Sequence, residues 1–284
     1  MIYFLCPTFG RIGMTRAAIN SIKEKFPPDS KFVILDDKPP FLTYDLLHEK
    51  EPSVHVIKGS GDLFWGGGMN RLLHYVCKNF ALCDSDKIIF FNNDICLEKI
   101  NVERFFREIN KFGMVHPVLI NDFRVRIPAG SKIITWLPFL TINDTRVPFR
   151  DGISFVDMAS ARFLAFNAGL LNLIGQIDPG LPHYGGDNDF VLRAKRFGVK
   201  PVISNAATVK VSESDSGIKI NNNPSLRSFF LSFWSIKSPN SLKYRFRLVS
   251  NHKNKLLAVF IVASMTVKAV AGYLFFKMLK NEAP

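Results

Sequence analysis

Carboxylate and amide side chains gather in this sequence where short apolar runs end. Asp36 and Asp37 follow one such run, and Asn92, Asn93 and Asp94 follow another. Hard oxygen ligands of this kind suit Mg²⁺ or Mn²⁺, and a cation held by Asp94 would neutralise negative charge on a diphosphate. An isolated Asn-Asn-Asp triplet is also an ordinary strand-ending turn. Its chemical meaning therefore depends on what the rest of the chain brings beside it.

A second acidic group, Asp187 and Asp189, opens a helix predicted over residues 187–197, after the turn-rich loop DPGLPHYGG. A carboxylate at a helix start can accept a proton from an attacking hydroxyl, although the helix dipole tends to lower its pKa. Asp187 is also a normal N-cap residue, and the two roles are compatible. Asp189, in the first turn, is expected to be a supporting residue.

The elements that must position these groups alternate between strand and helix over the first 120 residues. Apolar runs predict strands at 2–6, 31–35, 54–57 and 87–91, and helical spacing predicts helices at 14–25 and 70–79, with the glycine-rich loop GSGDLFWGGG between the third strand and the second helix. This order predicts a parallel sheet with crossover helices. Ligands bind outside the carboxyl ends of such strands, where the polar clusters lie.

Composition and charge exclude several classes of protein. The 284 residues are 47% hydrophobic and 21% charged, which is typical of a globular chain. Four irregularly spaced cysteines exclude a disulfide-rich scaffold and a CxxC zinc ribbon, and no signal peptide is expected, which favours a reducing compartment. Residues 219–284 carry net charge +10 of the total +13, with Glu282 as their one acid. The chain therefore reads as a near-neutral body with a cationic tail, which favours an anionic partner surface.

The tail contains the apolar stretch 256–276, which is interrupted by one charged residue, Lys268. Its length would allow a bilayer span, but a central lysine costs roughly 2.5–3.5 kcal/mol on insertion. An interfacial helix with a stripe formed by Leu257, Ile261, Met265 and Ala269 is the favoured interpretation, and spanning and soluble packing remain alternatives.

Five segments together resemble a family 2 glycosyltransferase of the GT-A fold. In chain order they are PTFGR at 7–11, ILDD at 34–37, DLFWGGGMN at 62–70, FFNND at 90–94 and YGGDNDF at 184–190. Their order and spacing are more specific than any one motif, and they run over about three quarters of the chain. The Trp-Gly-Gly form is similar to a bacterial polysaccharide and O-antigen assembly subset, with rhamnosyl- or galactofuranosyltransferases as the nearest types.

This resemblance implies an α/β, Rossmann-like fold with a mostly parallel central sheet flanked by helices. It implies an inverting hexosyl transfer with Asp187 as general base and a divalent cation, Mg²⁺ or Mn²⁺, at Asp94. The implied donor-binding residues are Pro7, Thr8, Arg11, Asp36, Asp37, Trp65, Gly66, Gly67, Asn70, Asn92 and Asn93, and the implied acceptor residues are His183, Tyr184 and Asp189.

Several of these residues could instead have purely structural roles. Trp65 can belong to the core, Gly66 and Gly67 to a flexible turn, Asn70 to a helix cap and Arg11 to a solvated loop. The chain also departs from the family pattern. Gly10 replaces the usual asparagine, and no late histidine completes a metal site, so that metal is either held by Asp94 with the donor phosphates or partly replaced by Lys210.

The expected function is sugar transfer from a UDP- or dTDP-sugar to a hydroxyl of a lipid-linked glycan in cell-surface polysaccharide synthesis. The catalytic domain is placed at 1–218 and a basic, amphipathic, membrane-associating tail at 219–284, so the expected location is peripheral, on the cytoplasmic face of the inner membrane. The main alternative is a non-catalytic scaffold that retains the fold. Nucleic-acid binding by the tail is disfavoured, a sugar-nucleotide pyrophosphorylase is disfavoured because its glycine-rich activation loop is missing, and a homodimer is left open.

Overall fold

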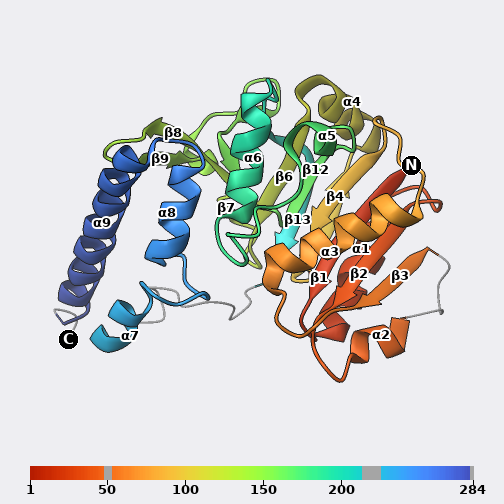
Figure 1. Ribbon diagram of the computed structural model, residues 1–284. Coiled ribbons are helices and arrows are strands. Elements are labelled where there is room, and N and C mark those ends of the chain that lie inside the picture. Colours follow the sequence, from red (N-terminus) through yellow and green to blue (C-terminus); the bar gives the residue numbers. More distant parts are fainter. Residues whose placement is uncertain (48–52, 213–224, 282–284) are drawn as a thin grey trace.

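The computed structural model describes residues 1–47, 53–212 and 225–281, the side chains of 279–281 excepted. A ten-stranded sheet forms its centre (Figure 1). The strand order is β10 (Ile153–Phe155), β13 (Val202–Val211), β6 (Met114–Ile120), β12 (Phe163–Asn167), β4 (Lys87–Phe91), β1 (Ile2–Thr8), β2 (Lys31–Asp36) and β3 (Val54–Lys58), with β5 (Ile95–Ile100) on β13 and β7 (Arg126–Ile127) on β6. The half formed by β4, β1, β2 and β3 is parallel, as predicted, and β12 runs antiparallel beside it.

Alternating phenylalanines attach helices to both faces of this sheet, because successive strand residues point to opposite sides. Phe90 of β4 meets the rings of Trp65, at 6.4 Å, and Phe190, at 5.6 Å, which belong to α3 (Phe64–Asn79) and α6 (Gly186–Arg196). Phe91 meets Phe4, at 6.3 Å, on the opposite face, where α1 (Ile12–Lys23) and α4 (Val102–Phe112) pack.

Smaller elements complete the body. A three-stranded sheet joins β11 (Met158–Ala159), β8 (Gly130–Thr135) and β9 (Leu140–Asn143), and the short helices are α2 (Leu42–Leu47), α5 (Leu170–Ile174) and η1 (Asp144–Arg146). In η1 the buried Asp144 accepts the backbone N–H groups of Ala129 and Gly130 and pairs with Arg126 at 2.8 Å. This carboxylate therefore fixes the start of the small sheet.

Three C-terminal helices follow: α7 (Leu226–Leu231), α8 (Leu242–Ser250) and α9 (Lys255–Asn281). Helix α8 lies beside α6, α9 begins close to the small sheet, and α7 lies near the C-terminal end of α9 (Figure 1). The helix predicted at 256–276 is confirmed as part of α9. Among the described residues, one helix, Lys255–Met278, has the length and composition to cross a membrane, and 22% of its apolar stretch is buried in the protein. The predicted domain boundary at 218/219 lies outside the described residues.

The predicted glycine loop is wrong in one respect: Trp65 and the three glycines after it form the first turns of α3. The helix begins at Phe64, which has a positive φ of 54°, whereas helical spacing alone had placed the start at Asn70. Glycine disfavours a helix, but close packing requires it at position 68 of α3. A Cβ at this position would lie 2.8 Å from Pro7 Cβ and 2.9 Å from Leu35 Cδ2, so glycine lets α3 pack directly on β1 and β2.

Candidate active site

The carboxyl ends of the parallel strands meet at one edge of the sheet, as the sequence predicted. The register places Thr8 of β1 opposite Asp36 of β2, and β4, which ends before Asn92, lies on the other side of β1. The first turn of α6 approaches the same edge, because residues 161 and 162, just before β12, bind both α6 and the residue after β4. The Asn92 N–H donates to the Arg162 carbonyl at 3.2 Å, and the Ala161 N–H donates to the Asp187 carboxylate.

Asp187 sits in the first turn of α6, after Gly185 with its φ of 83°. Its carboxylate accepts the Asn188 N–H at 2.8 Å. Burial raises the pKa of Asp187 above the ordinary aspartate value, although backbone N–H donors and the positive charge of Arg162 oppose the shift. A desolvated carboxylate with a raised pKa is a better proton acceptor than an exposed aspartate.

Arg162 is the residue that sequence reasoning missed. It precedes β12, is half-buried, and places a positive charge near Asp187, Tyr184 and His116. Within the described part of the chain, its guanidinium makes no hydrogen bond or ion pair. No local signal marks it, because its position depends on β12 pairing with β4 across a long sequence separation. A cation left without a carboxylate partner here is suited to a negatively charged substrate group.

Asp94 is 8% exposed at the end of β4, and its carbonyl accepts the Ser212 N–H at 2.9 Å. Burial, together with the negative charge of Asp94, raises the pKa of the neighbouring Cys6 thiol well above its ordinary value. No group of three or more His, Cys, Asp or Glu side chains suited to a metal occurs among the described residues. One buried carboxylate still fits a Mg²⁺-type site in which substrate phosphates and water supply the other ligands.

Lys210, the alternative source of positive charge, lies on β13 with its ammonium 3.8 Å from an Asp122 carboxylate oxygen. Asn92 and Asn93 are both half-buried beside Asp94. The Asn93 amide donates to the Thr15 hydroxyl of α1 at 3.2 Å, which ties this turn to the helix.

The two aspartates after β2 bind backbone groups of the protein. The Asp36 carboxylate, fully buried, accepts N–H groups from Thr43 at 2.8 Å and Tyr44 at 3.1 Å and so caps α2. Asp37, 4% exposed, accepts N–H groups from Gly61 at 2.8 Å and Leu63 at 2.9 Å. Both side chains thus fix the loops at the edge of the site through hydrogen bonds to the protein backbone.

The residues of α3 bind the loop that precedes α6. The Gly66 N–H donates to the Pro182 carbonyl at 2.7 Å, and a Cβ on Gly66 would lie 2.9 Å from the Leu181 carbonyl oxygen. Asn70 exchanges two hydrogen bonds of 2.9 Å with the backbone of Ile177. Trp65 packs against the sheet and lies close to Gly186, which agrees with the core alternative. Gly67 has only Leu63 nearby.

The remaining donor-side candidates lie around β1. Pro7 packs against Gly68, and the Thr8 hydroxyl donates to the Leu35 carbonyl at 2.8 Å. Arg11 is exposed with a positive φ of 62°, at the start of α1. Among these residues Arg11 has the side chain most open to a ligand.

His183 and Tyr184 lie in the loop before α6, next to Gly185, which approaches Leu248 of α8. The His183 ring contacts Phe64 at 5.8 Å and Tyr184 at 4.7 Å, and its Nδ1 is buried without a hydrogen bond among the described residues. Burial lowers the pKa of His183, and the positive charge of Lys237 lowers it further. The C-terminal segment therefore forms one wall beside the two predicted acceptor residues.

Asp189 lies in the first turn of α6, where its carboxylate joins an internal hydrogen-bond network. It is fully buried, and its carboxylate accepts hydrogen bonds from Arg193 at 2.7 Å, Asn251 at 2.9 Å and His252 at 3.0 Å. Burial raises its pKa, but these donors outweigh burial, so the net pKa is lowered. The side chain thus fastens the C-terminal end of α8 to α6.

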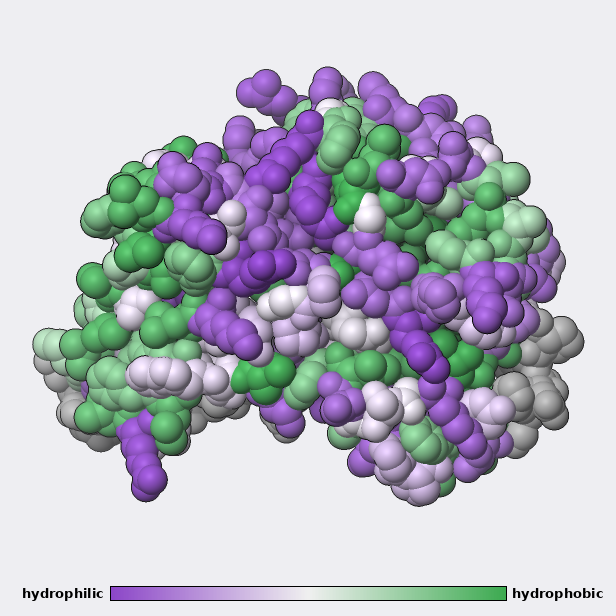
Figure 2. Space-filling model, in the orientation of Figure 1, coloured by the Kyte–Doolittle hydropathy of each residue, from purple (hydrophilic) through white to green (hydrophobic). Residues whose placement is uncertain are grey.

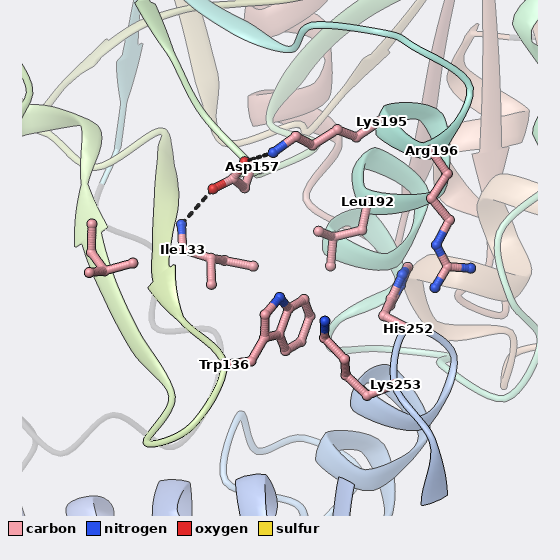
Figure 3. Close-up of a pocket in the computed structure, with 9 residues that line it drawn as sticks. Ile133, Trp136, Asp157, Leu192, Lys195, Arg196, His252 and Lys253 are labelled. Atoms are coloured by element: carbon pink, nitrogen blue, oxygen red, sulfur yellow. Dashed lines mark hydrogen bonds and ion pairs between the residues drawn. The ribbon is translucent and has the colours of Figure 1, made fainter. Parts of the chain in front are cut away.

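A separate cavity of about 380 Å³ lies near the C-terminal end of α6 (Figure 3). Trp136 forms one side, with the Lys253 ammonium 4.8 Å from its ring, and Asp157 pairs with Lys195 on another. Asp187 is at the opposite end of α6 and does not line this cavity. The candidate catalytic groups therefore belong to the sheet edge.

Comparison with known proteins supports the fold. No family model matches this chain, and no curated protein matches it by sequence. A crystal structure of GalNAc-T7 with UDP, GalNAc and Mn²⁺ is similar over 93% of this chain and 54% of that one, with 14% identity and a TM-score of 0.57. A structure of S. aureus TarS 1–349 is similar over 94% of this chain and 71% of that one, with 13% identity and a TM-score of 0.56.

This chain thus spans about half the length of the GalNAc-T7 chain. At these identities the likeness concerns the fold. The chain has the α/β GT-A fold of glycosyltransferases, with a long C-terminal helix added to it.

Proposed function

We propose that this protein is an inverting glycosyltransferase that moves a sugar from a nucleoside-diphosphate sugar to a hydroxyl group. The observation that carries the proposal is the Asp187 carboxylate, whose pKa burial raises, next to the cationic Arg162 at the carboxyl edge of a GT-A sheet. A base for the acceptor and a cation for the leaving group are the two requirements of this reaction.

In the proposed reaction, the acceptor oxygen attacks the anomeric carbon while the bond from that carbon to the diphosphate oxygen breaks. The hydroxyl proton passes to Asp187, and the electron pair of the broken bond leaves with the nucleoside diphosphate. Arg162 stabilises the charge that develops on the leaving diphosphate. Asp94 would hold a divalent cation, which adds positive charge to the same diphosphate when bound. The GalNAc-T7 structure, solved with Mn²⁺ and UDP, supports this assignment by analogy of fold alone.

We further propose a lipid-linked glycan as acceptor, in the assembly of a bacterial cell-surface polysaccharide. The support is the motif resemblance together with the C-terminal helices beside His183 and Tyr184. The Trp-Gly-Gly segment favours a rhamnosyl or galactofuranosyl donor, although Gly66 also serves the close packing of α3 on the 181–182 backbone.

Donor binding separates this function from the scaffold alternative. Thermal shift is measured with a panel of UDP- and dTDP-sugars in Mn²⁺, in Mg²⁺ and in EDTA, on the wild type and on Asp94→Ala. One donor that stabilises the wild type only with metal, and does not stabilise Asp94→Ala, supports both the transferase and the metal assignment. Stabilisation that survives EDTA removes the metal assignment. Failure of every nucleotide sugar to bind favours a non-catalytic scaffold.

A further inference from the structure

Helix α9 has two apolar faces, and the described part of the chain packs on one of them. The inner face packs on α7 and α8 through buried Ala258, Ile261, Val262 and Tyr273. The stripe from Leu257 to Ala269, on which the interfacial interpretation rested, belongs to this covered side. The stripe interpreted from the sequence as membrane-facing therefore packs on the protein body.

The outer face of α9 is a second apolar stripe, open to solvent. It consists of exposed residues at helical spacing, namely Leu256, Val259, Phe260, Ala263, Val267, Ala271, Leu274, Phe275 and Met278. Leu256 is 72% exposed and Val267 is 68% exposed, so the whole stripe faces water. Figure 2 shows hydrophobic residues gathered over the lobe formed by the C-terminal helices.

Helix α7 packs on the covered face of α9 near the C-terminal end of that helix. Phe229 stacks on Tyr273 with ring centroids 4.1 Å apart, which holds α7 against α9. Beyond that contact, Leu231 is 58% exposed and Trp234 is 73% exposed. An exposed apolar stripe that runs along most of α9 is unusual on a protein that works alone in water.

The charge around the surface selects its partner. Residues 225–281 contain ten Lys and Arg and no Asp or Glu. Lys255 is exposed at the start of the outer face, and Lys277 lies near its other end. Apolar residues with cations at their margins are typical of helices that lie in the headgroup region of anionic bilayers.

Lys268 explains why α9 would lie flat. Its ammonium donates to the Phe139 carbonyl at 2.6 Å, which joins the middle of α9 to the hairpin of β8 and β9. The inner face is held by the body from Ala258 to Tyr273, so most of the helix is attached along its length. A bilayer crossing would break these contacts and bury the lysine in lipid.

We propose that the outer face of α9 docks parallel to the surface of an anionic lipid bilayer. This proposal stands independently of the glycosyltransferase assignment, because it uses none of the active-site groups. The partner is the lipid surface itself, recognised by its apolar interior and its negative headgroups.

The test is binding of the full chain to sedimentable vesicles of phosphatidylcholine, with or without phosphatidylglycerol. The variant Phe260→Ser/Val267→Ser/Phe275→Ser removes three outer-face side chains, and each loss is expected to weaken binding by roughly tenfold. The matched control is Phe123→Ser/Phe155→Ser/Leu173→Ser, which removes apolar side chains exposed elsewhere, at 83%, 47% and 56%. Thermal unfolding confirms that each variant folds.

We expect strong binding to the anionic vesicles, weak binding to neutral ones, a decrease with salt, and loss in the outer-face variant alone. Lys255→Gln/Lys277→Gln should reduce anionic binding and leave the weak neutral binding unchanged. The proposal is overturned if the two triple variants bind equally, or if the outer-face variant dissociates a dimer that never binds vesicles. Resistance of the bound protein to alkaline extraction would show a span and would also overturn it.

Discussion

The adjacent glycines Gly66 and Gly67 give the sharpest test of how the Trp-Gly-Gly segment works. A Cβ on Gly66 would lie 2.9 Å from the Leu181 carbonyl oxygen, 3.1 Å from the Pro182 carbonyl oxygen and 3.3 Å from Pro182 Cα. These are backbone atoms and cannot rotate away. A Cβ on Gly67 would meet only Leu63, at 3.4 and 3.6 Å, which is ordinary contact. The same substitution, glycine to alanine, should therefore have opposite effects at the two positions.

The magnitudes follow from helix propensity and packing. Alanine is favoured over glycine inside a helix by about 1 kcal/mol, so Gly67→Ala should stabilise the protein by up to that amount. Gly66→Ala gains the same term but forces the 181–182 backbone outward, and overpacking costs roughly 1–3 kcal/mol. The two variants should therefore differ in free energy of unfolding by about 1–3 kcal/mol, with Gly66→Ala the less stable.

Urea unfolding measures this difference, and donor titration of each folded variant shows whether the site is disturbed. Because Gly66 holds the loop that leads to Asp187, we expect Gly66→Ala to lose activity as well as stability, and Gly67→Ala to retain donor affinity. Equal stability of the two variants would refute the packing argument. Loss of donor affinity in a fully stable Gly67→Ala would instead show that the glycines admit the donor.

Three further outcomes follow from the electrostatics of the described side chains. The substitution Asp187→Asn should lower kcat by roughly 10²- to 10⁴-fold. In the wild type, kcat/KM should fall on acidification at a pH above the ordinary aspartate pKa of about 3.9, because burial raises the pKa of this base. Arg162→Ala should lower kcat by roughly 10²-fold. It should also move the acidic fall of kcat/KM to higher pH, since removal of the positive charge raises the pKa of Asp187 further. An unchanged pH profile would show that Arg162 does not interact with the base. The pKa of Asp178 is lowered to about 2 because hydrogen bonds from Arg247, Asn251 and Gly180 outweigh burial. Its ionised form thus stabilises the fold above about pH 4, and this gain is lost as pH falls towards 2. Arg247→Gln should lower the free energy of unfolding by about 1 kcal/mol at neutral pH, because solvent screens the half-exposed guanidinium. In acid unfolding curves, this difference between variant and wild type should disappear near pH 2.

The strands and their shared polar edge could be predicted because apolar runs and the residues after them are local features. The positions of β1, β2, β3 and β4, and the meeting of their ends, followed from the order of these runs. The start of α6 was predicted to within a residue by Asp187 and the turn formers before it.

Long-range contacts account for what the sequence did not reveal. Low helix propensity predicted a loop for the three glycines, but Gly68 lies inside α3. Glycine is needed there because Pro7 and Leu35 leave no space for a Cβ. Nothing near Asp37 in the chain shows that its carboxylate binds the backbone of Gly61 and Leu63.

Arg162 and α9 have the same explanation. The position of Arg162 at the site depends on β12 inserting antiparallel between β4 and β6, which local periodicity does not encode. In α9 both faces are apolar, so the periodicity alone did not indicate which face packs on the body.

The most direct test of the central claim is the hydrolysis of each nucleotide sugar, with Mn²⁺ present, by the wild type and by Asp187→Asn. In this assay water takes the place of the acceptor hydroxyl, the sugar passes to water, and nucleoside diphosphate is released. The glycosyltransferase assignment predicts that the wild type turns over one donor, and that Asp187→Asn binds this donor with similar affinity but releases product at least about 10²-fold more slowly. Equal rates for the two proteins, or no turnover of any donor that binds, would contradict the assignment of Asp187 as the base of a sugar transfer.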